Sequence, residues 1–141
     1  MMHEKKFFTT NLDVRFRDLD AMGHVNNAVF FTYFEQGRLD FFNSAVSAGA
    51  FPGFEFILAH ISCDYLKPVT IDDRLTLQIR VGKIGRKSFN FSYAIVDRTD
   101  ANCIYATGES VNMMKSLKAE PPSTLILAFV GLDTEQMADN S

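Results

Sequence analysis

The sequence predicts an α+β fold in which a five-stranded antiparallel sheet wraps around one long central helix. Only one long stretch, residues 28–46, places its aromatic side chains near helical spacing. The segments around it alternate apolar and polar residues with the period of two that is typical of strands. The helix candidate is apolar on most of its faces, so other parts of the protein must surround it.

The first strand is expected over residues 8–17, where Leu12, Val14 and Phe16 alternate with charged residues. The helix candidate that follows contains Gly37, which costs about 1 kcal/mol relative to alanine in a helix interior. A close approach between this helix and the sheet would explain the glycine.

The rest of the chain reads mostly as strands. Four are expected, over residues 56–66, 74–81, 88–95 and 103–115. Short polar segments, "KPVTIDD", "GKIGRK" and "DRTDAN", separate them and are typical of antiparallel connections. "PPSTLILAF" predicts a short final helix, because proline is tolerated at a helix start.

The 141 residues suit a single domain, which we assign to residues 1–132, followed by a polar and disordered tail over residues 133–141. A sheet that curls around a single helix is the hotdog architecture. A sheet of this size leaves an open edge and an uncovered part of the helix. We therefore expect a homodimer, or a homotetramer built from two dimers.

Composition excludes several classes of partner. The net charge of −3 argues against nucleic-acid binding driven by bulk charge. The N-terminal residues show no apolar signal region, and the longest apolar run, "LILAFVGL", is too short to cross a membrane. Cys63 and Cys103 lack metal-ligand spacing and are expected to be buried thiols in a reducing compartment. We expect a cytoplasmic protein without a membrane partner, metal or cofactor.

Familiar catalytic motifs are absent. The chain has no GxSxG, GxxxxGK[ST] or HExxH pattern, and only three histidines. His3 lies near the N-terminus, and His60 within a strand favours a structural role over metal binding. His24 has no partner at metal-ligand spacing.

A polar segment directly before the helix is the strongest candidate site. Asn26 and Asn27 precede the apolar run, and asparagine is a strong N-cap residue. The first turn of a helix carries free N–H groups and the positive end of the helix dipole, which suit a developing oxyanion. Asp18 and Asp20 lie just upstream, and Gly23 allows the connection to turn. These are also ordinary loop residues, and the residues alone do not choose between the two aspartates.

This segment resembles the start of the 4-hydroxybenzoyl-CoA thioesterase family, hotdog-fold enzymes that hydrolyse acyl-CoA thioesters. The shared pattern is an aromatic, then D-x-D-x-x-G-H-V-N-N, then an aromatic helix with E-x-x-R. The matching residues are Phe16, Asp18, Asp20, Gly23, His24, Val25, Asn26, Asn27, Glu35 and Arg38. The resemblance continues at "DYLKPV" and "GKIGRKSFNFSYAI" and covers about residues 10–118.

The resemblance implies that Asp20, the second aspartate of the pair, is catalytic. It would attack the thioester carbonyl or activate a water molecule, while the backbone amide of Asn27 polarises that carbonyl. Gly23 and His24 belong to the same loop, and His24 is expected to order the loop or line the pocket. The same resemblance implies that Asn26 would lie beside the substrate at the helix start.

Two further groups are candidates for substrate contact. Glu35 and Arg38 are three residues apart on the helix and favour a structural ion pair. Glu35 is also an alternative catalytic carboxylate, because another class of hotdog thioesterases uses a helix glutamate. Lys83, Arg86 and Lys87 cluster at a turn, where they suit the phosphates of coenzyme A or form a solvated loop.

The leading functional hypothesis is therefore hydrolysis of an acyl-CoA thioester. One alternative is a hotdog dehydratase or hydratase, in which Asp20 and His24 would transfer protons. The other is an acyl-thioester-binding protein without catalysis. The acyl group, and the choice between coenzyme A and an acyl-carrier protein, stay open from the sequence.

Overall fold

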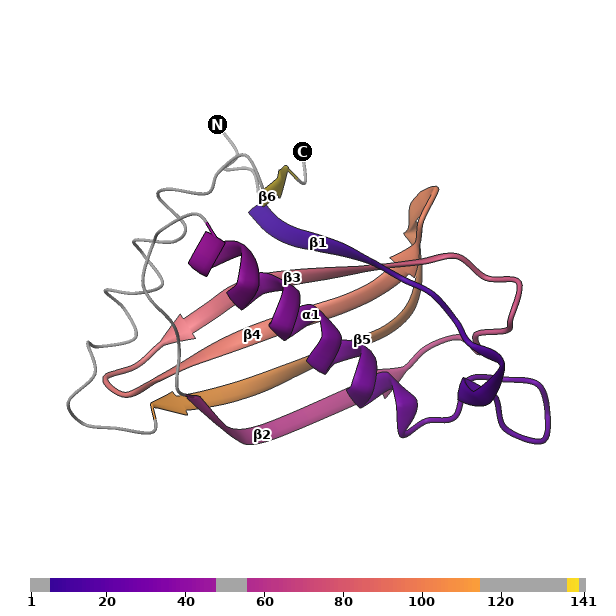
Figure 1. The fold of residues 1–141 in the computed structure, drawn as a ribbon, viewed down its shortest axis with the longest axis horizontal. Helices are drawn as coiled ribbons and strands as arrows, with labels where there is room; N and C mark the ends of the chain where they lie inside the picture. Colours follow the sequence, from indigo (N-terminus) through magenta and orange to yellow (C-terminus); the bar gives the residue numbers. More distant parts are fainter. Residues whose placement is uncertain (1–5, 48–55, 115–136, 140–141) are drawn as a thin grey trace.

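The computed structural model describes residues 6–47, 56–114 and 137–139. The described chain contains one long helix, a short 3-10 helix and six strands. In chain order these are β1 (Lys6–Leu12), η1 (Phe16–Asp18), α1 (Val29–Ser47), β2 (Phe56–Tyr65), β3 (Leu75–Ile84), β4 (Ser88–Asp97), β5 (Asp100–Met114) and β6 (Met137–Asp139). Figure 1 shows α1 running diagonally across the sheet.

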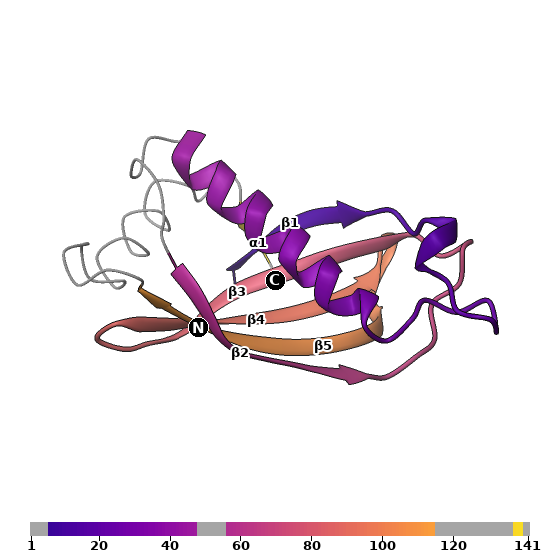
Figure 2. The ribbon, with the colours of Figure 1, turned by 60° about the horizontal axis from the view of Figure 1, so that its bottom comes forward.

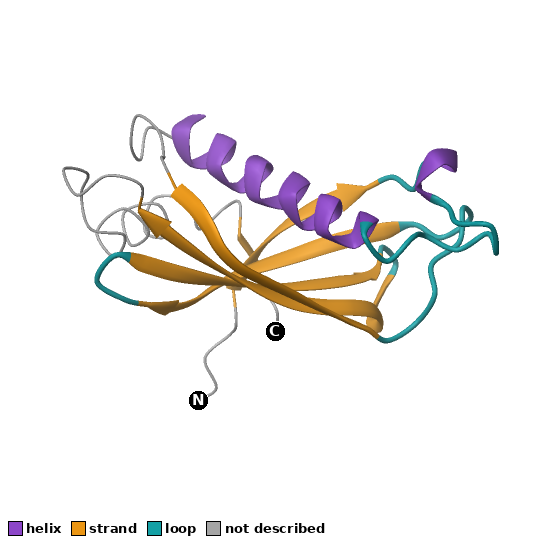
Figure 3. Cartoon of the chain, turned by 90° about the horizontal axis from the view of Figure 1, so that it is seen from below, coloured by secondary structure: helices purple, strands orange, loops and turns teal. Residues whose placement is uncertain are grey.

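The strands form one antiparallel sheet in the order β2-β5-β4-β3-β1-β6. The predicted five strands and the single long helix are confirmed. The sheet curves, and α1 lies along its inner face (Figures 2 and 3). This is the predicted hotdog arrangement.

Aromatic side chains fill the space between α1 and the sheet. Phe34 is fully buried and stacks on Tyr93 of β4, with ring centroids 4.3 Å apart. Phe41 packs edge-on against Phe91 of β4 at 4.9 Å and against Phe8 of β1 at 5.6 Å. Such pairs contribute about 0.5–1.5 kcal/mol each beyond the burial of their area. Aromatic contacts with the central strand β4 and with β1 therefore hold the helix against the sheet.

Gly37 lies where α1 packs closely against β3. A Cβ atom at this position would lie 2.8 Å from Cδ1 of Ile79 and would also overlap Cδ2 of Leu77. Any larger side chain would push the helix off β3. The prediction that this glycine permits a close approach is confirmed.

The first strand is shorter than predicted. β1 ends at Leu12, which pairs with Leu75, the first residue of β3, so residues 13–17 have no strand partner there. The chain instead turns into η1, closed by a 2.8 Å hydrogen bond from the backbone N–H of Asp18 to the carbonyl of Arg15. Phe16, expected within this strand, lies in η1 instead and is 85% exposed.

Two other expectations concern the ends of elements. β5 begins at Asp100, which pairs with Asp97, so the turn between β4 and β5 is shorter than the expected segment of residues 97–102. Met137–Asp139, expected to be disordered, pair as β6 with β1, because that outer strand offers free backbone groups. The helix expected at "PPSTLILAF" lies outside the described residues.

Cys63 and Cys103 are both free and only partly buried. Burial raises the pKa of the Cys63 thiol above its usual range. His60, expected to be a structural histidine inside a strand, is exposed on β2 next to a register shift in the pairing with β5. No helix of the described residues is long and apolar enough to cross a membrane.

Candidate active site

Residues 18–26 form a small hairpin in front of α1. Its base is closed by a 2.8 Å hydrogen bond from the Asn26 N–H to the Asp18 carbonyl, and its middle by a 2.7 Å bond from the Asp20 N–H to the His24 carbonyl. Gly23 turns the tip with φ of 80°, a conformation that favours glycine. The expectation that Gly23 allows an unusual turn is confirmed.

The side chain of Asp20 lies against this turn. Its Oδ1 accepts hydrogen bonds from the backbone N–H groups of Met22, at 2.9 Å, and His24, at 3.1 Å. Oδ2 accepts no hydrogen bond from the part of the chain that the structure describes. Asp20 is exposed, so the carboxylate is held through one oxygen and presents the other to solvent.

Asp18 has a different environment. It is only 5% exposed, and its Oδ2 accepts hydrogen bonds from the Tyr33 hydroxyl, at 2.8 Å, and from the backbone N–H of Arg15, at 2.9 Å. A buried carboxylate with two donors on one oxygen is typical of a structural role. Burial supplies the distinction between the two aspartates that the residues alone did not.

The start of α1 leaves one backbone donor uncommitted. The Asn26 side chain accepts a 2.9 Å hydrogen bond from the Ala28 N–H, and the Asn26 carbonyl accepts one of 2.9 Å from Val29. Asn26 therefore acts as the predicted capping residue. Among the described residues, the N–H of Asn27 has no acceptor. It lies at the positive end of the helix dipole.

Asn27 is also tied to the sheet. The Tyr65 hydroxyl, at the end of β2, donates a 2.8 Å hydrogen bond to the Asn27 carbonyl. The Tyr65 ring packs edge-on against Phe30, with centroids 5.1 Å apart. The edge strand thereby holds the first turn of α1.

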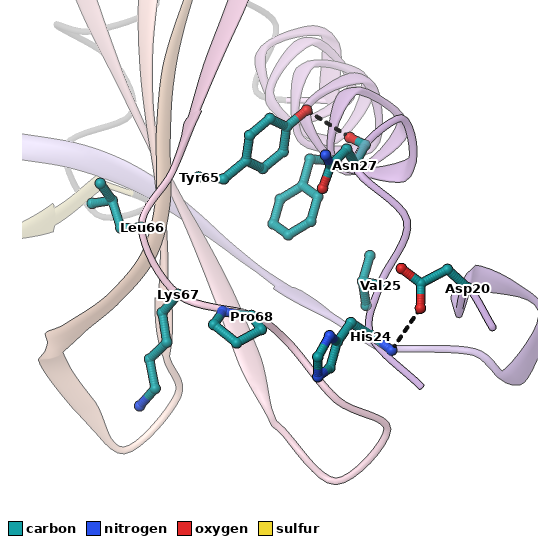
Figure 4. A pocket seen from close by; sticks show the side chains of 9 residues that line it. Asp20, His24, Val25, Asn27, Tyr65, Leu66, Lys67 and Pro68 are labelled. Carbon is teal, nitrogen blue, oxygen red and sulfur yellow. Dashed lines mark hydrogen bonds between the residues drawn. The ribbon is translucent and has the colours of Figure 1, made fainter. Parts of the chain in front are cut away.

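A cavity of about 250 Å³ lies at this junction, and we call it the Asp20 cavity. Its lining residues are Asp20, His24, Val25, Asn27, Phe30, Tyr65, Leu66, Lys67 and Pro68. In Figure 4, Asp20 and Asn27 lie on one side of it, and the segment from Tyr65 to Pro68 lies opposite. The cavity therefore combines a carboxylate, a helix terminus and an apolar wall, whereas the Lys67 ammonium is directed away to the Cys103 Sγ, 3.4 Å from it.

His24 contributes to the candidate site mainly through its backbone, which helps to hold the Asp20 side chain. Its N–H donates to Asp20, and its imidazole lies beside Pro68 in Figure 4. Within the described residues, the ring makes no hydrogen bond to the Asp20 carboxylate. This placement agrees with the expectation that His24 orders the loop and lines the pocket.

Glu35 lies outside the Asp20 cavity. It lines a second cavity of about 280 Å³, the Glu35 cavity, together with Arg38, Leu39, Phe42, Phe56, Leu58 and Asn112. The predicted Glu35–Arg38 ion pair is wrong. Arg38 instead donates a 3.1 Å hydrogen bond to the Tyr93 hydroxyl, which is paired in turn with Ser110 of β5. The partner of Arg38 comes from the sheet because Tyr93 lies directly beneath the helix.

The turn between β3 and β4, the basic turn, carries Lys83, Arg86 and Lys87, and it lies at the end of the sheet opposite the Asp20 cavity (Figure 1). The pairing places Ser88 level with Met113, whereas Tyr65 of the Asp20 cavity is level with Ala106 and Ile95. Seven residues of β4 therefore separate the two levels, roughly 23 Å at 3.3 Å per residue. Within one chain, this turn does not line the Asp20 cavity.

Sequence reasoning missed the wall of the cavity formed by Phe30 and the segment from Tyr65 to Pro68. Tyr65 is 38 residues from Asn27 in the chain, so no local spacing connects them. The one signal was "DYLKPV", which carries part of the family resemblance without indicating a role for its residues.

Comparison with known proteins identifies the family. The model of the thioesterase-like superfamily matches residues 14–129. The chain belongs to this superfamily. The fold of this chain agrees with that of a Synechocystis 1,4-dihydroxy-2-naphthoyl-CoA thioesterase, which is 22% identical and has a TM-score of 0.73 over 90% of this chain and 98% of that one.

Two relatives are more similar in sequence. A Thermus thermophilus thioesterase, crystallised with coenzyme A and zinc, is 28% identical, with a TM-score of 0.71 over 90% of this chain and 94% of that one. A Nostoc punctiforme 1,4-dihydroxy-2-naphthoyl-CoA hydrolase is 33% identical over 92 residues, 62% of either chain. Among the described residues of this superfamily member, no group of three histidine, cysteine or acidic side chains could hold a metal.

Proposed function

We propose that this protein hydrolyses acyl-CoA thioesters to a free acid and coenzyme A. The observation that carries the proposal is the pairing, in one cavity, of a carboxylate oxygen on Asp20 with the uncommitted backbone N–H of Asn27. The superfamily and its named thioesterase members support the reaction class.

The Asn27 amide would bind the thioester carbonyl oxygen at the end of the helix dipole. Negative charge that develops on this oxygen is stabilised by a preorganised donor. Asp20 would then either attack the carbonyl carbon or remove a proton from an attacking water molecule. In the first route the C–S bond breaks as a mixed anhydride forms on Asp20, and water then hydrolyses this anhydride; in the second route the water molecule displaces the thiolate directly. In both, coenzyme A leaves as its thiol, and water supplies the oxygen that is added overall.

The remaining residues of the cavity would bind rather than react. Val25, Phe30, Leu66 and Pro68 provide an apolar surface for the acyl group or the thiol arm of the carrier. The Asn26 side chain holds the helix start, and Gly23 and His24 hold the turn that carries Asp20.

We propose that the protein is a homodimer that pairs the free edge of β2 with the same edge of a second copy. Among the described strands, β2 pairs with β5 alone, and its exposed side chains include Ile57, Leu58 and Tyr65. Paired outer edges and covered apolar side chains stabilise such an assembly. Sedimentation should show a species of at least two chains at micromolar concentration, and a monomer would contradict the proposal.

The same pairing would give the basic turn a role. Antiparallel pairing of β2 with its copy puts the Tyr65 end of one strand beside the Phe56 end of the other. The Phe56 end is level with the β3–β4 turn, because Ile57 pairs with Met113 and Met113 with Ser88. Lys83, Arg86 and Lys87 of the second copy would then approach the first copy's cavity, where they would bind the phosphates of coenzyme A.

The function is tested by measuring free thiol release from a panel of acyl-CoAs of different length and aromaticity, and from an acyl-carrier protein. Thiol release supports the proposal and identifies the acyl group and the carrier. Loss of enoyl absorbance without thiol release would identify a dehydratase or hydratase instead. Binding of acyl-CoA with neither signal would identify a non-catalytic binding protein.

A further inference from the structure

A buried contact lies beneath the hairpin of residues 18–26 and outside the Asp20 cavity. The Tyr33 hydroxyl, in the second turn of α1, donates a 2.8 Å hydrogen bond to Oδ2 of Asp18. Both side chains are 5% exposed. The contact joins the base of the hairpin to the body of the helix, and the reaction scheme makes no direct use of it.

The hairpin and the helix each carry one half of the candidate site. The hairpin is closed by its own main-chain hydrogen bonds and carries Asp20. The free amide of Asn27 lies at the start of the helix, and Tyr33 lies in the second turn of α1. Their relative placement therefore decides how far the carboxylate lies from the amide.

We infer that Tyr33 and Asp18 are positioning residues whose hydrogen bond sets where the Asp20 carboxylate lies relative to the Asn27 amide. This inference rests on the proposed function. Only Leu19 separates Asp18 from Asp20, and Leu19 is itself bridged to Val25 across the hairpin. A shift of Asp18 is therefore transmitted to Asp20, and a misplacement of about 1 Å can reduce a rate on the order of a hundredfold.

The protonation of Tyr33 suits this role. Burial, and next its hydrogen bond to the Asp18 carboxylate, raise the pKa of the Tyr33 phenol well above its usual range. The hydroxyl therefore stays protonated at neutral pH and can donate to the Asp18 carboxylate. Asp18 also accepts a 2.9 Å hydrogen bond from the Arg15 backbone N–H, and its Oδ1 lies 3.9 Å from the Arg15 Nε, so its carboxylate is held both by the turn that precedes the hairpin and by the helix.

The first test is Tyr33→Phe, which removes the hydroxyl and keeps the ring. We expect kcat to fall roughly tenfold with KM unchanged within about twofold, because binding groups stay while the carboxylate is displaced. The matched control is Thr10→Val, which removes a 2.6 Å hydroxyl bond from β1 to Asp40 of the same helix. Both variants should lose some thermal stability, and only Tyr33→Phe should lose kcat. Equal kcat in the two variants would overturn the inference.

A second pair of variants separates positioning from general stability. In the Asp20→Asn background, Tyr33→Phe should change the residual rate by less than about twofold, because the residue through which it acts is already removed. Asp18→Asn keeps an acceptor for both donors and should retain kcat within about threefold, whereas Asp18→Leu should match Tyr33→Phe. A full tenfold loss in both backgrounds would show a merely structural role.

Amide hydrogen exchange tests the inference without any substrate. The N–H groups of Met22 and His24 are bonded to Asp20 and report on the hairpin. In Tyr33→Phe they should exchange about tenfold faster than in Thr10→Val, and equal exchange would overturn the inference. Absence of thiol release by the unmodified protein would refute the proposed function, and the exchange result would still decide whether Tyr33 and Asp18 order the hairpin.

Discussion

Two cavities beside the same helix each contain a carboxylate, and only one of them meets the start of that helix. The Asp20 cavity, of about 250 Å³, contains the first residues of α1 and the uncommitted N–H of Asn27. The Glu35 cavity, of about 280 Å³, borders the middle of α1, where backbone N–H groups are used within the helix. The two cavities are similar in size. Among the described residues, they differ because the Asp20 cavity has an available backbone N–H donor and the Glu35 cavity does not.

Arg38, the one cationic side chain among the described residues that line the Glu35 cavity, does not replace the missing backbone donor. Arg38 lines the Glu35 cavity, but its guanidinium is directed to the Tyr93 hydroxyl in the buried network with Ser110. An arginine bound to the sheet in this way is suited to supporting the helix. In this protein, a carboxylate beside α1 is therefore not enough to make a candidate thioesterase site. It needs a donor for the oxyanion, and helix termini supply one.

The largest effect is expected at Asp20. Asp20→Asn keeps the shape and removes the charge needed by a nucleophile or a general base, so kcat should fall on the order of a thousandfold. KM should change little, because the amide and the cavity walls remain. Thiol-release kinetics and thermal unfolding should be measured together, with Asp18→Asn as the control of similar chemistry. If Asp20→Asn kept most of its turnover while Glu35→Gln lost it, the Glu35 cavity would be the active site.

The next largest effect should come from the backbone of residue 27. Asn27→Pro removes the N–H without forbidding a helix start, where proline is tolerated, and should lower kcat about a hundredfold. Asn27→Ala keeps the N–H and should stay within about threefold of the unmodified protein. Circular dichroism checks that the helix content is retained. Equal activity of the two variants would show that this amide does not stabilise the reaction.

The basic turn should have a moderate effect on binding alone. Replacing Lys83, Arg86 and Lys87 together by alanine should raise KM for acyl-CoA about tenfold and leave kcat within about twofold, the signature of lost uniform binding. Added salt should raise KM of the unmodified protein and have less effect on the variant. An unchanged KM in steady-state assays would mean that these side chains form only a solvated loop.

The smallest effect is expected at Glu35. It is exposed and forms no ion pair with Arg38, so Glu35→Gln should change kcat and the melting temperature by little. We expect kcat within about twofold in the same thiol-release assay. A loss above about tenfold would assign chemistry to the Glu35 cavity.

The periodicity of the sequence was sufficient for the fold. Strands with one buried face alternate every second residue, and a surrounded helix is apolar on most sides, so both patterns are local and readable. Gly37 and Gly23 were also correctly interpreted. Gly37 leaves room for β3 beside the helix, and Gly23 adopts a positive φ in a turn, so each reason applies at the glycine itself. The predicted end of the first strand, at residue 17, was wrong. A strand ends where its partner strand ends, and the partner residue that ends β1, Leu75, is far along the chain.

The sequence by itself determined the hotdog fold and the segment that carries the candidate site, since both depend on short-range patterns. The family resemblance already favoured Asp20 over Asp18, and the tertiary structure supplied the physical difference, because Asp18 is buried and bonded to Tyr33, 15 residues away. Only the tertiary structure directed Arg38 to Tyr93, 55 residues away, and placed Lys83, Arg86 and Lys87 at the far end of the sheet. Contacts between distant residues are decided by how the helix crosses the curved sheet, and no local spacing encodes that crossing.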